Sequence, residues 1–218
     1  MGKKHTFLQI LVLSTATVAA LMIAVGAIYE ASASWKPTDL QTDGRPRIGR
    51  LEAKIEMVVI EDFRCGACRF FTEKIFPHIQ SDYIDTGKAF CIVVPVSFLE
   101  GSKPLANASL AVYKIAPDRF VSFWHAIFNQ FYGRRSNGME QKEILEIAEK
   151  IGGIDLKKMR EYVESNAFYP QLDQNLDWAK RIMGNDFGTP ALYVNGIRTS
   201  TSSVESIQER MEKLERER

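Results

Sequence analysis

The sequence predicts an α/β fold in which a helical insertion separates two parts of one core. Apolar β-type runs at 53–60 and 88–98 flank a segment with helical periodicity at 66–84. A further β-type run at 191–199 follows only after a long stretch of helical patterns. The helical insertion therefore spans about residues 100–186, and the core around it is discontinuous in sequence.

Local signals indicate where the expected elements begin, bend and end. Pro77 predicts a kink or break near Phe76, because proline removes a helical hydrogen bond. Pro95 predicts that strand pairing fails near the end of its strand. Asn195-Gly196 predicts a tight hairpin turn. The other expected elements are an edge strand at 47–50, helices at 105–115, 118–131, 137–152 and 170–183, and helices that begin near Asp155 and Val204.

Length and composition are those of one globular domain with an appendage. The chain has 218 residues, of which 45% are hydrophobic and 25% charged. Three cysteines are too few for a disulfide scaffold. Without residues 1–33, which contain Lys3, Lys4 and Glu30, the basic residues fall from 28 to 26 and the acidic ones from 27 to 26. This neutral balance gives no support for nucleic-acid binding.

The N-terminus predicts export. Lys3 and Lys4 precede an uncharged, largely apolar run of 23 residues from Phe7 to Tyr29. Its length favours a membrane anchor, whereas Ala31-Ser32-Ala33 fits a signal-peptide cleavage site. Both alternatives place the lysines in the cytoplasm and the rest of the chain outside it. The expected organisation is an anchor or signal at 1–33, a linker at 34–46 and a domain at 47–218.

Cys65 and Cys68 form a Cys-x-x-Cys pair where a strand gives way to a helix. At a helix N-terminus, free N–H groups and the helix dipole favour a thiolate, and Arg64 and Arg69 add positive charge. Cysteines in such settings have pKa values of roughly 3.5–7.5. Residues three apart lie on one helix face, within the range that a disulfide bridges. The pair therefore predicts reversible disulfide chemistry.

Other interpretations of the cysteines are weaker. A zinc site needs four ligands, and the chain has no second cysteine pair and only three scattered histidines: His5, His78 and His125. A purely structural disulfide across three residues constrains the unfolded chain little. Cys91 is expected to be a buried small hydrophobe, with a regulatory pairing to Cys65 as the alternative. His125 lies in an aromatic helix and is expected to be packed and hydrogen-bonded.

A second motif, Gly188-Thr189-Pro190 followed by Asn195-Gly196, gives the pair a family context. The chain resembles the DsbA-like thiol:disulfide oxidoreductases of the thioredoxin-like superfamily, in particular the membrane-anchored, exported branch similar to BdbD. The resemblance covers about residues 45–218. It also includes Arg47-Ile48-Gly49, Asp62-Phe63-Arg64-Cys65-Gly66-Ala67-Cys68 and Phe123-Trp124-His125-Ala126-Ile127-Phe128-Asn129-Gln130.

The resemblance implies a thioredoxin-like fold and a set of site residues. Pro190 is expected to be cis and to lie against the cysteine pair, with the Thr189 backbone free to bind an extended substrate. The implied catalytic set is Cys65, Cys68, Thr189 and Pro190, with no cofactor beyond the Cys65–Cys68 disulfide. The implied partners are unfolded exported proteins, the membrane, and a quinone-linked thiol oxidase or another membrane redox protein. No nucleic-acid partner is implied.

The chain departs from the family pattern at two points. The acidic residue that the family often carries six positions before the first cysteine is Val59 here. Strand alternation puts Glu61 on the same side, where it is the candidate substitute, with water as the alternative proton carrier. The dipeptide Gly66-Ala67 lacks an imidazole, so the pKa of Cys65 is expected above about 3.5 and the potential between about −120 and −270 mV.

Three functions remain open at this stage. The first is a protein-disulfide oxidase that acts through Cys65 and Cys68 and a mixed-disulfide intermediate. The second keeps these residues and reverses the electron flow, as an extracytoplasmic reductase or isomerase. The third is a membrane-tethered, peptide-binding chaperone in which the cysteine pair is incidental.

Overall fold

The computed structural model of the chain describes residues 15–25, 37–50, 52–131 and 141–216. It divides after Pro37 into two units, of which the second holds the folded domain. In the first unit, residues 15–25 are helical and their side chains are exposed. No helix among the described residues has both the length and the apolarity to cross a membrane. Most of the predicted hydrophobic run lies outside the described residues.

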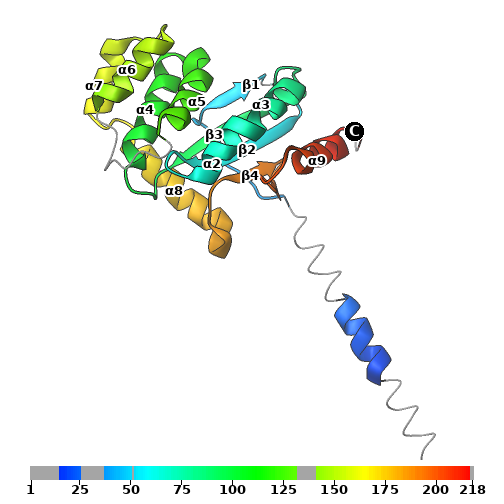
Figure 1. The fold of residues 1–218 in the computed structure, drawn as a ribbon. Coiled ribbons are helices and arrows are strands. Elements are labelled where there is room, and N and C mark those ends of the chain that lie inside the picture. Colours follow the sequence, from blue (N-terminus) through cyan, green and yellow to red (C-terminus); the bar gives the residue numbers. More distant parts are fainter. Residues whose placement is uncertain (1–14, 26–36, 51, 132–140, 217–218) are drawn as a thin grey trace, which may run out of the picture. The chain divides into compact units, whose positions relative to one another are not determined.

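The domain is built on a five-stranded mixed sheet with the order β1-β3-β2-β4-β5 (Figure 1). The strands are β1 (Arg47–Gly49), β2 (Ile55–Asp62), β3 (Ala89–Val96), β4 (Ala191–Val194) and β5 (Ile197–Thr199). The central strands β2 and β3 are parallel, and the other neighbours are antiparallel. Strands from both ends of the chain therefore share one sheet, which confirms the expected discontinuous core.

The prediction that pairing fails near Pro95 is wrong. The register continues through Glu61 opposite Pro95 to Asp62 opposite Val96. The N–H and C=O of one strand residue point to the same side, and the Pro95 carbonyl accepts a hydrogen bond from Asn175 on the side away from β2. Because β1 pairs only with residues 90–92 of β3, the sheet needs no N–H from this proline.

A continuous helical segment follows β2, as predicted. It consists of α2 (Gly66–Phe70), a π-type turn at Phe71–Ile75, α3 (Phe76–Ile79) and a second π-type turn at Gln80–Ile84. Pro77 stands in the first turn of α3, directly after the first π turn. Regular α-helical bonding therefore breaks near Phe76, where proline cannot donate.

The remaining helices follow the predicted order. They are α4 (Ser102–Ile115), α5 (Phe120–Phe131), α6 (Gln141–Ile151), α7 (Leu156–Glu164), α8 (Tyr169–Met183) and α9 (Val204–Arg216). Asp155 caps α7 by accepting bonds from the N–H groups of Lys157 and Lys158. The predicted cap at Asn137 lies outside the described residues.

Two apolar clusters show how the helices cover the sheet. On one face, Met57, Val59 and Leu192 pack with side chains of α2–α7 and α9. On the other face, Val58 and Ile92 pack against α8, whose Trp178 is buried there. Figure 1 shows α4 to α7 gathered beside the sheet and α8 beginning next to α4, where Lys103 pairs with Asp173 at 2.5 Å. The helical insertion thus contributes α4–α7 to the core on one face of the sheet and α8 to the core on the other.

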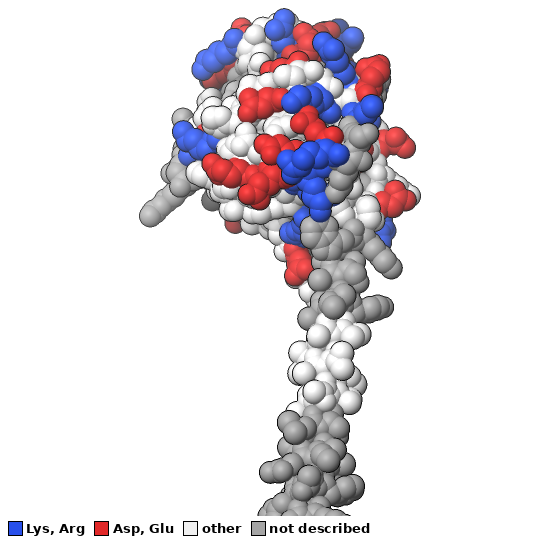
Figure 2. Space-filling view, turned by 90° about the vertical axis from the view of Figure 1, so that its right-hand side faces the viewer, with Lys and Arg blue, Asp and Glu red and all other residues white. Residues whose placement is uncertain are grey.

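Part of the predicted linker contacts the domain. The Thr38 N–H donates to the Gly196 carbonyl at 2.8 Å, and the Arg45 guanidinium lies 4.2 Å from the centre of the Trp178 ring. On the face drawn in Figure 2, Lys and Arg side chains alternate with Asp and Glu side chains. No extended region of a single charge forms on the described part of that face.

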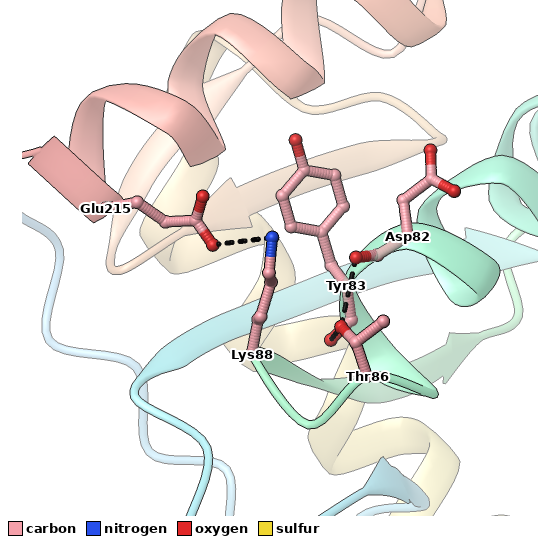
Figure 3. Close-up of polar contacts among 5 residues, drawn as sticks. All are labelled: Asp82, Tyr83, Thr86, Lys88 and Glu215. Carbon is pink, nitrogen blue, oxygen red and sulfur yellow. Dashed lines mark hydrogen bonds and ion pairs between the residues drawn. The ribbon is translucent and has the colours of Figure 1, made fainter.

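The C-terminal helix α9 is attached where the second π turn leads into β3. Lys88 pairs with Glu215 at 3.2 Å and lies 5.4 Å from the centre of the Tyr83 ring (Figure 3). The Thr86 hydroxyl donates to the carbonyls of Asp82 and Tyr83, which closes the turn before Lys88. These contacts fix the sheet end that lies away from the cysteine pair.

Candidate active site

The cysteine pair lies at the carboxyl end of the central strand β2. Cys65 is the N-cap residue of α2, and its N–H donates to the Asp62 carbonyl at 2.9 Å. The Cys68 N–H points at the Cys65 sulfur, at 3.4 Å. Cys65 is half-buried, whereas Cys68 is fully buried, and both are free thiols. The predicted strand-to-helix junction is confirmed, and it leaves only Cys65 accessible.

The two thiols have opposite acidities. Hydrogen bonding from Cys68, with help from the Thr189 side chain and from backbone N–H groups, lowers the pKa of Cys65 to about 6 despite its partial burial. Burial raises the pKa of Cys68, and its bond to Cys65 and the nearby Glu61 charge raise it further. Near neutral pH the reduced pair therefore carries one thiolate, on Cys65, and one proton, on Cys68.

The predicted second motif meets the cysteine pair in space. The Thr189–Pro190 peptide bond is cis, as the resemblance implied. The Cys65 thiol donates to the Thr189 carbonyl oxygen at 3.2 Å. Pairing between β4 and β2 begins only at Ala191, so this carbonyl is not part of the sheet ladder. Four residues predicted from two distant motifs, Cys65, Cys68, Thr189 and Pro190, thus belong to one site.

A groove of about 420 Å³ opens beside this site. Pro190 and Ala191 form one side of it, and Ala67 and Phe70 of α2 form another. Its far wall is polar and consists of Arg198, Thr199, Ser200, Thr201 and Ser202. The Phe70 side chain is 53% exposed and so presents an apolar surface to the groove. The groove has room for a short extended stretch of polypeptide between α2 and Pro190.

Glu61 is buried beneath the pair, on the strand face that alternation predicted. It has no exposed surface and follows Val59 at the end of β2. The Trp124 indole N–H and the Thr72 hydroxyl donate to its carboxyl oxygens. Burial raises the pKa of Glu61 well above its usual value, although these two bonds oppose the shift. Trp124 and Thr72 were missed as site residues, because the sequence indicates only that they lie on helices.

Asp62 holds the loop after β3 against the site. Its carboxylate accepts the N–H groups of Arg64, Phe98 and Leu99 at 2.8–3.0 Å. The Phe98 ring in turn contacts that of Phe187, just before the Gly-Thr-Pro motif, with ring centres 5.1 Å apart. Asp62 was also missed, because its backbone partners lie 36 and 37 residues later in the chain.

The remaining candidates lie outside the site. Cys91 is fully buried in β3, as expected of a small hydrophobe, and burial raises the pKa of its thiol. The His125 ring packs against Phe76 and Trp124, and burial lowers its pKa. In the described part of the chain, no three His, Cys, Asp or Glu side chains are grouped to hold a metal ion.

Comparison with known proteins identifies the family of this chain. The family model described as thioredoxin matches residues 41–213. The chain belongs to the thioredoxin family. Disulfide bond formation protein D of Bacillus subtilis is 28% identical over 172 residues, which are 78% of this chain and 77% of that protein.

Solved structures place the chain more narrowly within the thioredoxin family. Chlamydia trachomatis DsbA matches with a TM-score of 0.74 at 28% identity, over 83% of this chain and 95% of that one. Oxidised BdbD from Bacillus subtilis matches with a TM-score of 0.73 at 28% identity, over 82% and 95%. This thioredoxin-family protein is a DsbA-like thiol:disulfide oxidoreductase.

Proposed function

We propose that this protein is an exported protein-disulfide oxidase that passes its Cys65–Cys68 disulfide to unfolded secreted or envelope proteins. The observation that carries the proposal is the half-buried Cys65 thiol, whose pKa is lowered to about 6 beside a fully buried Cys68. A stabilised thiolate stabilises the reduced form, and a protein whose reduced form is stabilised donates its disulfide readily.

The first step breaks the Cys65–Cys68 bond. A substrate thiolate attacks the accessible Cys65 sulfur and forms a mixed disulfide, while Cys68 leaves and takes up a proton. Glu61 lies beneath the pair and is our candidate for relaying that proton from solvent to Cys68 and returning to its carboxylate form, in place of the acid missing at Val59. A second substrate thiolate then attacks the substrate sulfur of the mixed disulfide and releases Cys65 as a thiolate. The substrate loses two electrons and two protons, and the cysteine pair gains the electrons.

The surroundings of Cys65 suit a polypeptide substrate. We assign the Thr189 backbone and Pro190 the role of holding an extended chain next to the sulfur, along the groove lined by Phe70. A thiolate with a pKa of about 6 is also a good leaving group, so the mixed disulfide resolves quickly. Cys65 is therefore assigned as the attacked cysteine and Cys68 as the one that closes the ring.

Reoxidation and location complete the proposal. The reduced pair passes its electrons to a membrane quinone-linked thiol oxidase or another membrane redox partner. Residues 1–33 direct the domain to the periplasm or the cell exterior, as an anchor or as a signal cleaved near Ala33. The exposed apolar side chains of residues 15–25 support an apolar environment for this segment. The mass of the exported protein distinguishes the two alternatives.

The buried Glu61 gives one specific reason to keep the reverse direction as the second candidate. A carboxylate beneath the pair repels the Cys65 thiolate and so favours the disulfide form. A reductase or isomerase, fed with electrons from a membrane thiol carrier, needs a reduced pair whose disulfide is the more stable state. The residues and the mixed disulfide are the same in both directions.

Stoichiometric oxidation separates the candidates. The purified, oxidised protein is mixed with a reduced, unfolded substrate, and substrate thiols are counted against time. We expect one substrate disulfide for each Cys65–Cys68 disulfide consumed. When mixed in reduced form with a substrate that carries a disulfide, the Cys68→Ala variant should retain a mixed disulfide, because Cys65 attacks the substrate disulfide and no Cys68 thiol resolves the product. Cys65→Ala should form none. Reduction of an oxidised substrate by the reduced protein, without oxidation of a reduced one, would assign the reductase function instead.

A further inference from the structure

The contacts of Glu61 connect the helical insertion to the redox pair. Glu61 ends β2, Thr72 belongs to the π turn after α2, and Trp124 lies on α5 within the insertion. All three side chains are fully buried. Trp124 is itself fixed by aromatic packing, with ring centres 4.7 Å from Phe76 and 6.2 Å from Phe120. The indole therefore points its N–H at the carboxyl group from a rigid position.

The chemistry of these contacts suits the charged form of Glu61. The indole N–H can only donate, and the Thr72 hydroxyl is placed to donate to the other carboxyl oxygen at 3.3 Å. In both of these hydrogen bonds the Glu61 carboxyl group is therefore the acceptor. An ionised carboxyl group only accepts, whereas a protonated one needs an acceptor of its own. Removing either donor makes the charge on Glu61 less favourable.

Few other ionisable groups influence the charge on the Glu61 carboxyl group. The ionisable neighbours among the described residues are Cys65 and Cys68 of α2, Asp62 of β2 and Cys91 of β3. His125 of α5 stands beyond Trp124, with ring centres 5.4 Å apart. Negative charge on Cys65 raises the pKa of Glu61, as burial does, and a charged Glu61 disfavours thiolate formation in the pair. Glu61 and Cys65 therefore compete for negative charge.

We propose that Trp124 and Thr72 set the oxidising strength of the Cys65–Cys68 pair by holding Glu61 as a carboxylate beneath it. Trp124 and Thr72 are positioning residues, and they act only through Glu61. Reduction of the disulfide adds two electrons, one proton goes to Cys68, and the second charge remains on Cys65 as a thiolate. A carboxylate nearby makes that thiolate less stable, so the pair is a weaker oxidant than its helix N-terminus alone would make it. The inference rests on the redox pair of the proposed function.

Single and double variants of the full-length protein test the coupling. The readouts are the thiolate absorbance of Cys65 against pH, and the ratio [GSH]²/[GSSG] at which the pair is half reduced at pH 7. Glu61→Gln should lower the apparent pKa of Cys65 and lower that ratio about tenfold, which is a rise of about 30 mV. Trp124→Phe should shift both readouts in the same direction. In the Glu61→Gln background, Trp124→Phe should change neither.

Matched variants separate positioning from packing. Thr72→Val removes the hydroxyl and keeps the shape, so it should act like Trp124→Phe, whereas Thr72→Ser should behave like the wild type. Trp178→Phe alters a buried tryptophan of the other sheet face and should leave both readouts unchanged. If Trp124→Phe fails to fold, the two Thr72 variants still test the proposal.

The outcomes are distinct. The proposal is overturned if Glu61→Gln leaves the thiolate titration and the glutathione ratio unchanged. It is also overturned if Trp124→Phe or Thr72→Val shifts them equally with and without Glu61, because the effect would then come from packing. Failure of the proposed oxidase function would appear separately, as a wild-type protein that exchanges disulfides with glutathione but oxidises no unfolded substrate.

Discussion

The Cys65 thiol lies 3.2 Å from the backbone carbonyl oxygen of Thr189, which follows it by 124 residues in the chain. The two residues belong to different parts of the core, since Cys65 begins the helix after β2 and Thr189 precedes β4. The antiparallel pairing of β2 with β4, in which Ile60 lies opposite Ala191, brings them together. The site therefore forms only when β4, which follows the helical insertion in the chain, pairs with β2.

The difference in acidity between the cysteines predicts selective alkylation. In the reduced protein, the rate of reaction with iodoacetamide should rise with pH around a midpoint of about 6 and be level above about pH 7.5, because the thiolate is the nucleophile. The adduct should map to Cys65 alone. Cys68 and Cys91 should stay unmodified in the folded protein, because burial raises their pKa values and blocks access.

The control for this experiment is the Cys65→Ser variant, which should not react below about pH 9. Peptide mass spectrometry after a short pulse at each pH locates the adduct. A midpoint near 8.5, the value of an ordinary cysteine, would contradict the stabilised thiolate. Early labelling of Cys68 would contradict its burial.

Local patterns in the sequence were sufficient to predict most elements and the Cys65–Cys68 pair, whereas Thr189 and Pro190 were assigned to the site by the family resemblance. The strand predicted at 53–60 lies at 55–62, and the helix from Gly66 and the Asn195-Gly196 turn also follow from neighbouring residues. Both turn residues have positive φ, as a tight two-residue hairpin turn requires. The partnership of Cys65 with Pro190 came from the family resemblance, since no local rule joins two motifs so far apart. Pro95 was misjudged because its effect depends on how long β1 is.

Local sequence patterns could not predict which other side chains contact the site. Trp124 stands in an aromatic helix, and five aromatic residues there have nearly the same sequence signal. Which of them faces Glu61 depends on how α5 docks on the sheet. Asp62 has the same difficulty, because its partners at Phe98 and Leu99 are backbone groups that no residue type reveals. Alternation along β2 did place Glu61 correctly, since burial of one sheet face is a local property.

Burial of Glu61 predicts a pH-dependent gain in stability for Glu61→Gln. The pKa of Glu61 in the fold is raised, so the folded state holds a proton that the unfolded chain releases above about pH 4.5. Wild-type stability should therefore fall as pH rises from about 4.5 towards the raised pKa, by about 1.4 kcal/mol for each unit between the two. Urea unfolding of the oxidised protein at pH 4, 6 and 8 measures this, because the Cys65–Cys68 disulfide removes the titration of the Cys65 thiol, whose lowered pKa would give an opposite slope.

The glutamine variant should lose that slope. At pH 8 it should be more stable than the wild type, and at pH 4 the two should differ little, since glutamine still accepts from Trp124. Glu205→Gln is a suitable control, because Glu205 lies on the surface helix α9 and is not buried. A variant less stable than the wild type at every pH would show that the carboxylate stabilises the fold.

Alanine substitutions at Gly49 and Gly44 together test the packing of the edge strand. Both have positive φ, 98° and 74°, which disfavours a side chain. A Cβ at Gly49 would lie 2.8 Å from Ile84 Cγ2 and 3.1 Å from the Ala89 carbonyl oxygen, whereas one at Gly44 would meet nothing within 4 Å. Gly49→Ala should lower the free energy of unfolding by about 3 kcal/mol and Gly44→Ala by about 1 kcal/mol. Equal losses would mean that the backbone conformation alone matters.

Asp62 should contribute more to stability than any surface carboxylate of the domain. Its carboxylate accepts three backbone N–H groups while fully buried, and bonds of this charged type contribute about 1.5–3 kcal/mol each. Asp62→Ala should lower the free energy of unfolding by about 3 kcal/mol, because the N–H groups of Phe98 and Leu99 lose their acceptor. Asp62→Asn should be nearly as harmful, since its amide would direct N–H groups at N–H groups.

The surface pair of Lys103 and Asp173 supplies the comparison. Asp173 is 62% exposed in its side chain, so Asp173→Ala should cost about 0.5 kcal/mol or less. The loss at Asp62 should also reach the site, because Phe98 would no longer be held against Phe187 and the segment that leads to Thr189. Hydrogen exchange of the amides of residues 97–101 and 187–189 measures this second effect. Faster exchange in both segments is expected for Asp62→Ala. A loss of stability with unchanged exchange before Thr189 would show that Asp62 stabilises only the loop after β3.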